Sequence, residues 1–218
     1  MSLIFKKDTH QYFLNNKELF SVSKILDNYL GSNYDKIPKA KLEKAIIRGN
    51  CVHKVAELYF KYKNNQNVVN EIKTKIKNKS VFTEKILEYC FTLLDFLEQK
   101  FKKDKEYYIS EQMYYADIVA GTPDLIFKTE LDLYSIIDFK TYKVMTKELK
   151  EKATLQLTAY YWLLKQNGFK LTNTHYIIWI NENKLQTISI KITKEKLHEW
   201  EMAMFLWKEN WNGINNIT

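Results

Sequence analysis

The sequence predicts an α/β protein with a mainly helical first half, residues 1–104, and an α/β core over residues 105–218. Apolar residues recur at three- and four-residue spacing along much of the first half, which is typical of amphipathic helices. The second half instead holds β-branched and aromatic runs separated by short polar breaks. The 218 residues are 45% hydrophobic with only 5 Gly and 2 Pro, enough for one ordered domain.

The first half opens with short strands and continues in helices. Residues 3–20 hold apolar runs around polar turns, which predict a small hairpin. The segment "SVSKILDNYL" predicts a short helix that ends at Gly31. Pro38 suits the first turn of a long helix that carries His53. Residues 71–104 continue as further helical segments.

The second half changes period. The runs "EYYISEQMYYA", "DIVAGTPDLIFKT" and "LDLYSIIDFKTY" predict three strands of an antiparallel meander. A helix follows over "ELKEKATLQLTAYYWLLKQNGF" and stops at Gly168. Two more strands then precede a final helix, which Thr193 caps and which runs through Trp211.

Charge and cysteine content limit the class of protein. The net charge of +8 fits a polyanionic partner. A biased genome whose proteins are generally rich in lysine, asparagine and isoleucine could also produce it. Cys51 and Cys90 are too few for a disulfide framework or a four-cysteine metal site. The sequence shows no apolar stretch typical of a secretory signal or a membrane span, so we expect a cytosolic protein without a membrane partner.

Asp124, Asp138 and Lys140 form a group that is suited to catalysis. Along a strand, Asp138 and Lys140 project from the same face, while Phe139 points to the other. If the two preceding runs pair as a hairpin, Asp124 approaches Asp138 near the open end of the sheet. Two carboxylates in a pocket of low dielectric repel each other, and Mg²⁺ or Mn²⁺ removes that conflict. The alternative is an ordinary ion pair of Asp138 with Lys140 and a turn capped by Asp124.

Two helices bring further candidates. His53 lies on the apolar stripe of the long helix, where it is either a metal ligand or a buried histidine satisfied by a neighbour. Gly49, one turn earlier, predicts close approach of another group. Gln156 and Tyr160 share a face of the later helix and either cover the pocket or form a polar rim.

These segments resemble a known family. The segments "RGNCVHKVAELYF", "GTPD", "IIDFK" and "QLTAY" resemble motifs of the RecB-like nucleases of the PD-(D/E)xK superfamily. Their order and spacing also match. The resemblance spans about residues 40–165, and the opening "FKKDTHQYF" is similar to phage-type members. It implies a single nuclease domain, residues 1–218, with a restriction-endonuclease-like core in which helices flank a mixed central sheet.

The resemblance also implies roles. The catalytic residues would be Asp124, Asp138 and Lys140. The metal ligands would be His53, Asp124, Asp138 and the main-chain carbonyl of Phe139. Glu111 resembles an acidic position of several members, and Gln156 and Tyr160 would contact DNA or support the site. Members with an iron-sulfur cluster carry four cysteines, so we expect no cluster here.

The sequence therefore predicts a Mg²⁺- or Mn²⁺-dependent DNA exonuclease that cleaves phosphodiesters with metal-activated water. A structure-specific or flap endonuclease could use the same site, and an inactive DNA- or partner-binding protein could share the fold. Arg48, Lys54 and the lysines between 143 and 152 are candidate phosphate contacts, and Tyr142 could stack on bases. Expected partners are DNA and other DNA-processing proteins of repair or recombination, in the cytosol of a bacterium or phage-infected host.

Overall fold

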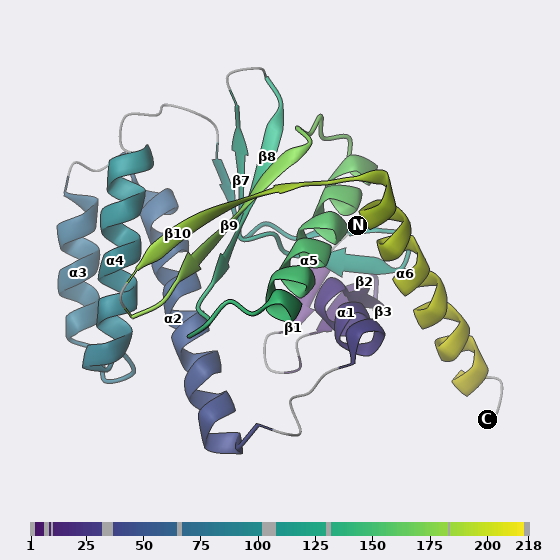
Figure 1. The fold of residues 1–218 in the computed structure, drawn as a ribbon, viewed down its shortest axis with the longest axis horizontal. Helices are drawn as coiled ribbons and strands as arrows, with labels where there is room; N and C mark the ends of the chain where they lie inside the picture. The colour runs from purple at the N-terminus through teal and green to yellow at the C-terminus, as the bar shows by residue number, and fades with distance from the viewer. Residues whose placement is uncertain are drawn as a thin grey trace.

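The structure is a computed structural model, shown in Figure 1. It describes residues 3–6, 9, 11–31, 37–64, 67–101, 108–129, 132–182 and 184–215, with side chains through 211. These residues form six helices and two five-stranded sheets. The helices are α1 (Val22–Leu30), α2 (Lys39–Tyr62), α3 (Val68–Lys77), α4 (Glu84–Phe101), α5 (Lys147–Gln166) and α6 (Lys194–Asn215).

The central sheet has the order β10-β9-β8-β7-β4. Its strands are β4 (Tyr108–Ser110), β7 (Leu125–Lys128), β8 (Tyr134–Lys140), β9 (Thr174–Ile180) and β10 (Leu185–Lys191). Strands β7 and β8 form the predicted antiparallel hairpin, while β8 and β9 run parallel because α5 crosses over between them. The sheet is therefore mixed, as predicted.

Helices cover both faces of this sheet. In Figure 1, α2, α3 and α4 stand on one side, and α5, α1 and α6 stand on the other. Alternate residues of β8 enter the two cores: Ile136 packs with the α5 side, whereas Ile137 and Phe139 pack with the α2 and α4 side. Asp138 and Lys140 share the face of Ile136, so they lie on the α5 side, where Lys140 contacts Gln156.

The second sheet differs from the predicted meander. It joins the N-terminal strands β1 (Leu3–Lys6), β2 (Gln11–Leu14) and β3 (Lys17–Ser21) to β6 (Val119–Gly121) and β5 (Tyr114–Ala116), in the order β1-β2-β3-β6-β5. The single meander was wrong: Glu111, with a positive φ angle, follows β4 where the chain leaves the central sheet, and Asp117, also with a positive φ angle, lies in the turn between β5 and β6 of the second sheet. The small side chains of β6 then allow parallel pairing with β3.

The helix ends follow local chemistry. The Ser21 side chain caps α1 by accepting from the Lys24 N–H, and Gly31 ends that helix with φ of 70°. Gly168, with φ of 82°, follows the end of α5 as predicted. Pro38 precedes α2 as its cap residue and does not lie inside the first turn. None of the helices in the described part of the chain has the length and apolar composition needed to cross a membrane.

Candidate active site

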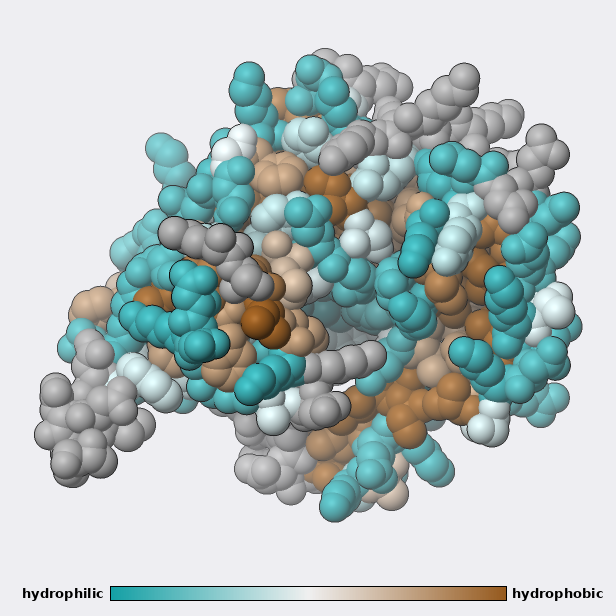
Figure 2. Space-filling model, turned by 180° about the vertical axis from the view of Figure 1, so that it is seen from behind, coloured by the Kyte–Doolittle hydropathy of each residue, from teal (hydrophilic) through white to brown (hydrophobic). Residues whose placement is uncertain are grey.

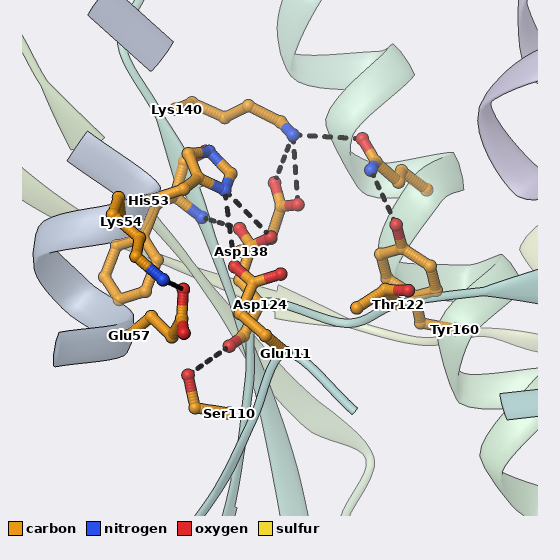
Figure 3. Close-up of polar contacts among 12 residues, drawn as sticks. His53, Lys54, Glu57, Ser110, Glu111, Thr122, Asp124, Asp138, Lys140 and Tyr160 are labelled. Atoms are coloured by element: carbon orange, nitrogen blue, oxygen red, sulfur yellow. Dashed lines mark hydrogen bonds and ion pairs between the residues drawn. The ribbon is translucent and has the colours of Figure 1, made fainter. Parts of the chain in front are cut away.

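The β7–β8 register brings two carboxylates together. Leu125 pairs with Ile137, so Asp124 lies one residue beyond, next to Asp138. The Phe139 N–H donates to Asp124 Oδ2 at 2.7 Å, which fixes the Asp124 side chain across the two strands. Asp138 is 0% exposed. Figure 3 shows both carboxylates pointing into one space below α2.

His53 reaches this space from α2. Its Nδ1 lies 3.1 Å from Asp124 Oδ1, and its Nε2 lies 3.1 Å from the main-chain oxygen of Phe139. The imidazole thus bridges the residue before β7, Asp124, and the end of β8, Phe139. The Phe139 carbonyl oxygen faces the imidazole in this arrangement.

Glu111 completes the acidic group. The residue has φ of 53° and its N–H donates to the Asp124 main-chain oxygen at 3.3 Å. This geometry turns its side chain toward His53, with 4.0 Å between Glu111 Oε1 and His53 Nδ1. Periodicity alone does not indicate this position, because Glu111 follows β4 in a turn of a kind that non-glycine residues rarely adopt. Only the family resemblance pointed to it.

Lys140 anchors a polar chain on the α5 side. Its Nζ lies 3.0 Å and 2.7 Å from the two carboxylate oxygens of Asp138, and it donates to Gln156 Oε1 at 3.0 Å. Gln156 Nε2 in turn donates to the Tyr160 hydroxyl at 3.1 Å. Because an ammonium can only donate, the carbonyl end of the Gln156 amide must face Lys140.

Gly121 makes room for this chain. A Cβ atom at Gly121 would lie 2.9 Å from Tyr160 Cε1 and 3.1 Å from Val22 Cγ2, closer than packed carbon atoms approach. The glycine of "GTPD" thus allows the Tyr160 ring to pack beneath the site. Gly49 differs: a Cβ there would meet only Thr141 Oγ1 at 3.7 Å, so the predicted close approach at Gly49 was wrong.

Burial and neighbouring charges both shift the pKa values of the site residues, and in His53 and Asp124 the two effects oppose each other. Burial lowers the pKa of His53, but the charge and hydrogen bond of Asp124 outweigh it and raise that pKa to about 9. Burial raises the pKa of Asp124, but the His53 charge outweighs it, so the net shift is downward. Burial, followed by the charge of Asp124, raises the pKa of Glu111 to about 7.

The second pair, Asp138 and Lys140, differs from the first because the pKa of its acid is raised. Burial raises the pKa of Asp138 to about 6 against the opposing charge of Lys140. Burial lowers the pKa of Lys140, but the charge of Asp138 outweighs it and raises that pKa above its usual range. The site therefore holds three acids, Glu111, Asp124 and Asp138, against two bases, His53 and Lys140.

The donor set fits a divalent cation. Ligand atoms of His53, Glu111 and Asp124 lie within 4.8 Å of one another. Two carboxylates and one imidazole are suitable ligands for Mn²⁺, and the carboxylates alone suit Mg²⁺. Asp138 Oδ2 is buried, and its ion-pair partner among the described residues is Lys140 Nζ at 2.7 Å. The His53 and Glu111 side chains are each 32% exposed, so an ion could enter from solvent.

The remaining sequence candidates lie around the site but are engaged within the protein. Arg48 Nη2 donates to the Thr141 main-chain oxygen at 2.7 Å. Lys54 pairs with Glu57 at 2.6 Å, one turn along α2. The Tyr142 main-chain oxygen accepts from Trp179 Nε1. Among the lysines between 143 and 152, Lys143, Lys147 and Lys150 are exposed, whereas Lys152 pairs with Asp27.

Comparisons with known proteins gave a family match and similarities to solved structures. Residues 27–205 match the family model described as the PD-(D/E)XK nuclease superfamily. The crystal structure of SSO0001 is 14% identical, with 84% of this chain and 85% of that chain covered and a TM-score of 0.38. A comparison with curated proteins gave no match.

A second crystal structure supports the fold. It is that of a protein from Eubacterium rectale named "Putative exonuclease", which is 18% identical over 94% of this chain and 84% of its own, with a TM-score of 0.51. This likeness, together with the mixed sheet between two helical layers, confirms the predicted core. Since the family model spans most of the sequence, the chain belongs to the PD-(D/E)XK nuclease superfamily.

Proposed function

We propose that this nuclease is a RecB-like DNA exonuclease that depends on Mg²⁺ or Mn²⁺. The observation that carries the proposal is the convergence of His53, Glu111 and Asp124 within 4.8 Å, beside the buried pair of Asp138 and Lys140. Phosphodiester hydrolysis needs positive charge at the phosphate and an oriented water molecule. This site combines acids that can hold a cation with a fixed ammonium.

Each residue then has a defined task. His53, Glu111 and Asp124 would hold the cation, with Asp138 at its border. A divalent cation bound there supplies Lewis acidity, which polarises a phosphoryl oxygen and lowers the pKa of water. Lys140 is held between Asp138 and Gln156, so its charge is positioned to stabilise the negative charge that develops on the phosphoryl oxygens as the P–O bond breaks.

Three observations favour a DNA exonuclease. The net charge of +8 suits a polyanion. The fold is similar to that of the Eubacterium rectale protein named "Putative exonuclease". Finally, Asp124, Asp138 and Lys140 are all present and lie together, whereas a protein that only binds DNA has no need for a costly buried acid cluster.

The test is a cleavage assay with end-labelled linear, closed circular and single-stranded DNA, each with Mn²⁺, Mg²⁺ or EDTA. We expect both linear forms to shorten from their ends with either metal, and circular DNA to stay intact. EDTA should stop all cleavage. Cleavage of circular DNA would instead indicate an endonuclease. Binding without cleavage under every metal condition would indicate the inactive DNA-binding alternative.

A further inference from the structure

The first turns of α2 bury none of their residues. No α2 residue before Cys51 is buried, whereas five residues from Cys51 to Tyr59 are buried. Ile46 is nevertheless 52% exposed. A short exposed helix gains little stability by itself, and Ile47 beside Ile46 is also 38% exposed, so this stretch of α2 presents adjoining apolar side chains to water.

This part of α2 leads directly to the candidate active site. Lys39, Ile46 and His53 recur every seven residues, so they share one face of the helix. Ile46 lies about 10 Å along the axis from His53, at 1.5 Å per residue. A ligand that lies on this face therefore reaches the imidazole at its far end.

The connection between β8 and α5 forms the other side of the approach. Val144 on this connection is 62% exposed, four residues after Lys140. Arg48 ties α2 to the same connection through the Thr141 carbonyl at 2.7 Å. Exposed Lys143 and Lys147 flank Val144. We call Lys39, Ile46, Lys143, Val144 and Lys147 the approach surface.

Figure 2 shows hydrophobic and hydrophilic surface next to each other in this part of the molecule. At the lower edge of the molecule, where the first turns of α2 lie in Figure 1, apolar surface stands next to projecting hydrophilic side chains. A hollow opens above this edge in the middle of the face. Apolar and hydrophilic groups thus lie side by side at this edge of the molecule.

We propose that the approach surface holds an unpaired nucleic-acid strand next to the phosphodiester that is cleaved, with Ile46 and Val144 against the bases and the lysines against the phosphates. This rests on the proposed nuclease function, which supplies the reason for a strand to lead into the site. A duplex presents phosphates on its outside and keeps its base faces stacked, so it offers nothing to Ile46. A single strand presents both phosphates and base faces, and apolar side chains can contact or insert between unstacked bases.

The test measures binding in EDTA, so that it does not depend on cleavage. The probes are a fluorescent single strand of about 12 nucleotides, the matching duplex, and a strand of equal length whose bases are removed. The variant is Ile46→Gln with Val144→Thr, which removes apolar surface without changing charge. Its control is Met202→Gln with Phe205→Gln, which removes similarly exposed apolar surface (38% and 54%) from α6.

We expect the Ile46 and Val144 variant to bind the single strand about 5–10 times more weakly, because one or two base contacts are lost. Its affinity for the duplex and the baseless strand should change less than about twofold. The control should match wild type on every probe. Equal losses on all three probes, or no loss on the single strand, would overturn the proposal. Absence of cleavage by wild type with Mn²⁺ would reject the proposed function, while base-dependent binding would still support the approach surface.

Discussion

The Arg48 guanidinium donates to the main-chain carbonyl of Thr141, 93 residues later, at 2.7 Å. Thr141 directly follows Lys140, so this bond fixes the end of β8 against α2. The Arg48 guanidinium also lies 5.2 Å from the centre of the Tyr89 ring, which supports its orientation. We therefore infer that Arg48 positions Lys140, in addition to any effect of its charge on DNA.

Arg48→Lys separates these two roles. The lysine keeps the positive charge but loses the planar guanidinium that reaches Thr141 and stacks on Tyr89. We expect kcat to fall about tenfold, because the chemistry is sensitive to small displacements of Lys140, while KM stays within about twofold. A large rise in KM with unchanged kcat would assign Arg48 to phosphate binding instead. Lys44→Gln, elsewhere on α2, is the control for a loss of charge.

Asp138→Asn tests the catalytic pair. The amide cannot balance Lys140 or border a cation in the same way, so we expect cleavage to fall at least about 1,000-fold. DNA binding in EDTA should stay near that of wild type, since most of the proposed phosphate contacts lie outside this pocket. Thermal unfolding must accompany the assay, because an unpaired buried Lys140 costs stability. Lys208→Met, which breaks the exposed pair with Asp117, is the matched control. Retained Mn²⁺-dependent cleavage by Asp138→Asn would remove Asp138 from the mechanism.

Glu111→Gln tests the metal set independently of activity. A ligand present at 100 times its dissociation constant stabilises the folded state by about 2.7 kcal/mol. We expect Mn²⁺ to raise the melting temperature of wild type, and this rise to shrink markedly in Glu111→Gln and His53→Ala. Glu57→Gln is the control, because Glu57 lies one turn after His53 but pairs with Lys54. The same Mn²⁺ response in all four proteins would show that these ligands do not hold the ion.

How much of this site the sequence predicts depends on how local each contact is. The alternation along β8 places Asp138 beside Lys140, and a single hairpin brings Asp124 to them, so spacing suffices for these three. The Ser21 cap and the Gly31 stop follow from similarly local chemistry.

Nonlocal contacts are not visible in spacing. The pairing of β3 with β6 joins residues about a hundred positions apart, and it divides what the sequence presented as one meander. The orientation of Glu111 depends on a positive φ angle that glutamate rarely adopts. Arg48 is of a residue type that often contacts phosphate, but here its guanidinium donates to the main-chain carbonyl of Thr141, which is far from it in the sequence.

Gly121→Ala and Gly49→Ala form a matched pair. A Cβ at Gly121 would press on Tyr160 and Val22 at about 3 Å, so we expect a loss of about 1–3 kcal/mol in unfolding free energy. Since Tyr160 accepts from Gln156, kcat should fall as well. Gly49 lies inside α2 with room for a Cβ, so alanine there should raise stability by up to about 1 kcal/mol. Chemical denaturation of both variants gives the comparison, and equal effects would contradict this account of the packing.

His175 provides a pH-dependent stability that is independent of the site. The residue is fully buried, and its Nδ1 accepts from the Ile136 N–H at 3.0 Å. Burial lowers the pKa of His175 from 6.5 to about 4. Between these values the unfolded chain binds the proton and the folded chain does not, so this contribution is complete above pH 6.5 and is lost as the pH falls toward 4.

The size of this effect follows from the shift. A difference of about two and a half pH units corresponds to about 3 kcal/mol. Asp138 and Glu111 act in the opposite direction over part of this range, because their pKa values are raised in the folded state and protonation there favours folding. The measurement is therefore the difference between wild type and His175→Gln in urea denaturation with EDTA, from pH 7 to pH 4. Wild type should lose stability relative to the variant as the pH falls, and parallel curves for the two proteins would mean that His175 titrates normally in the folded state.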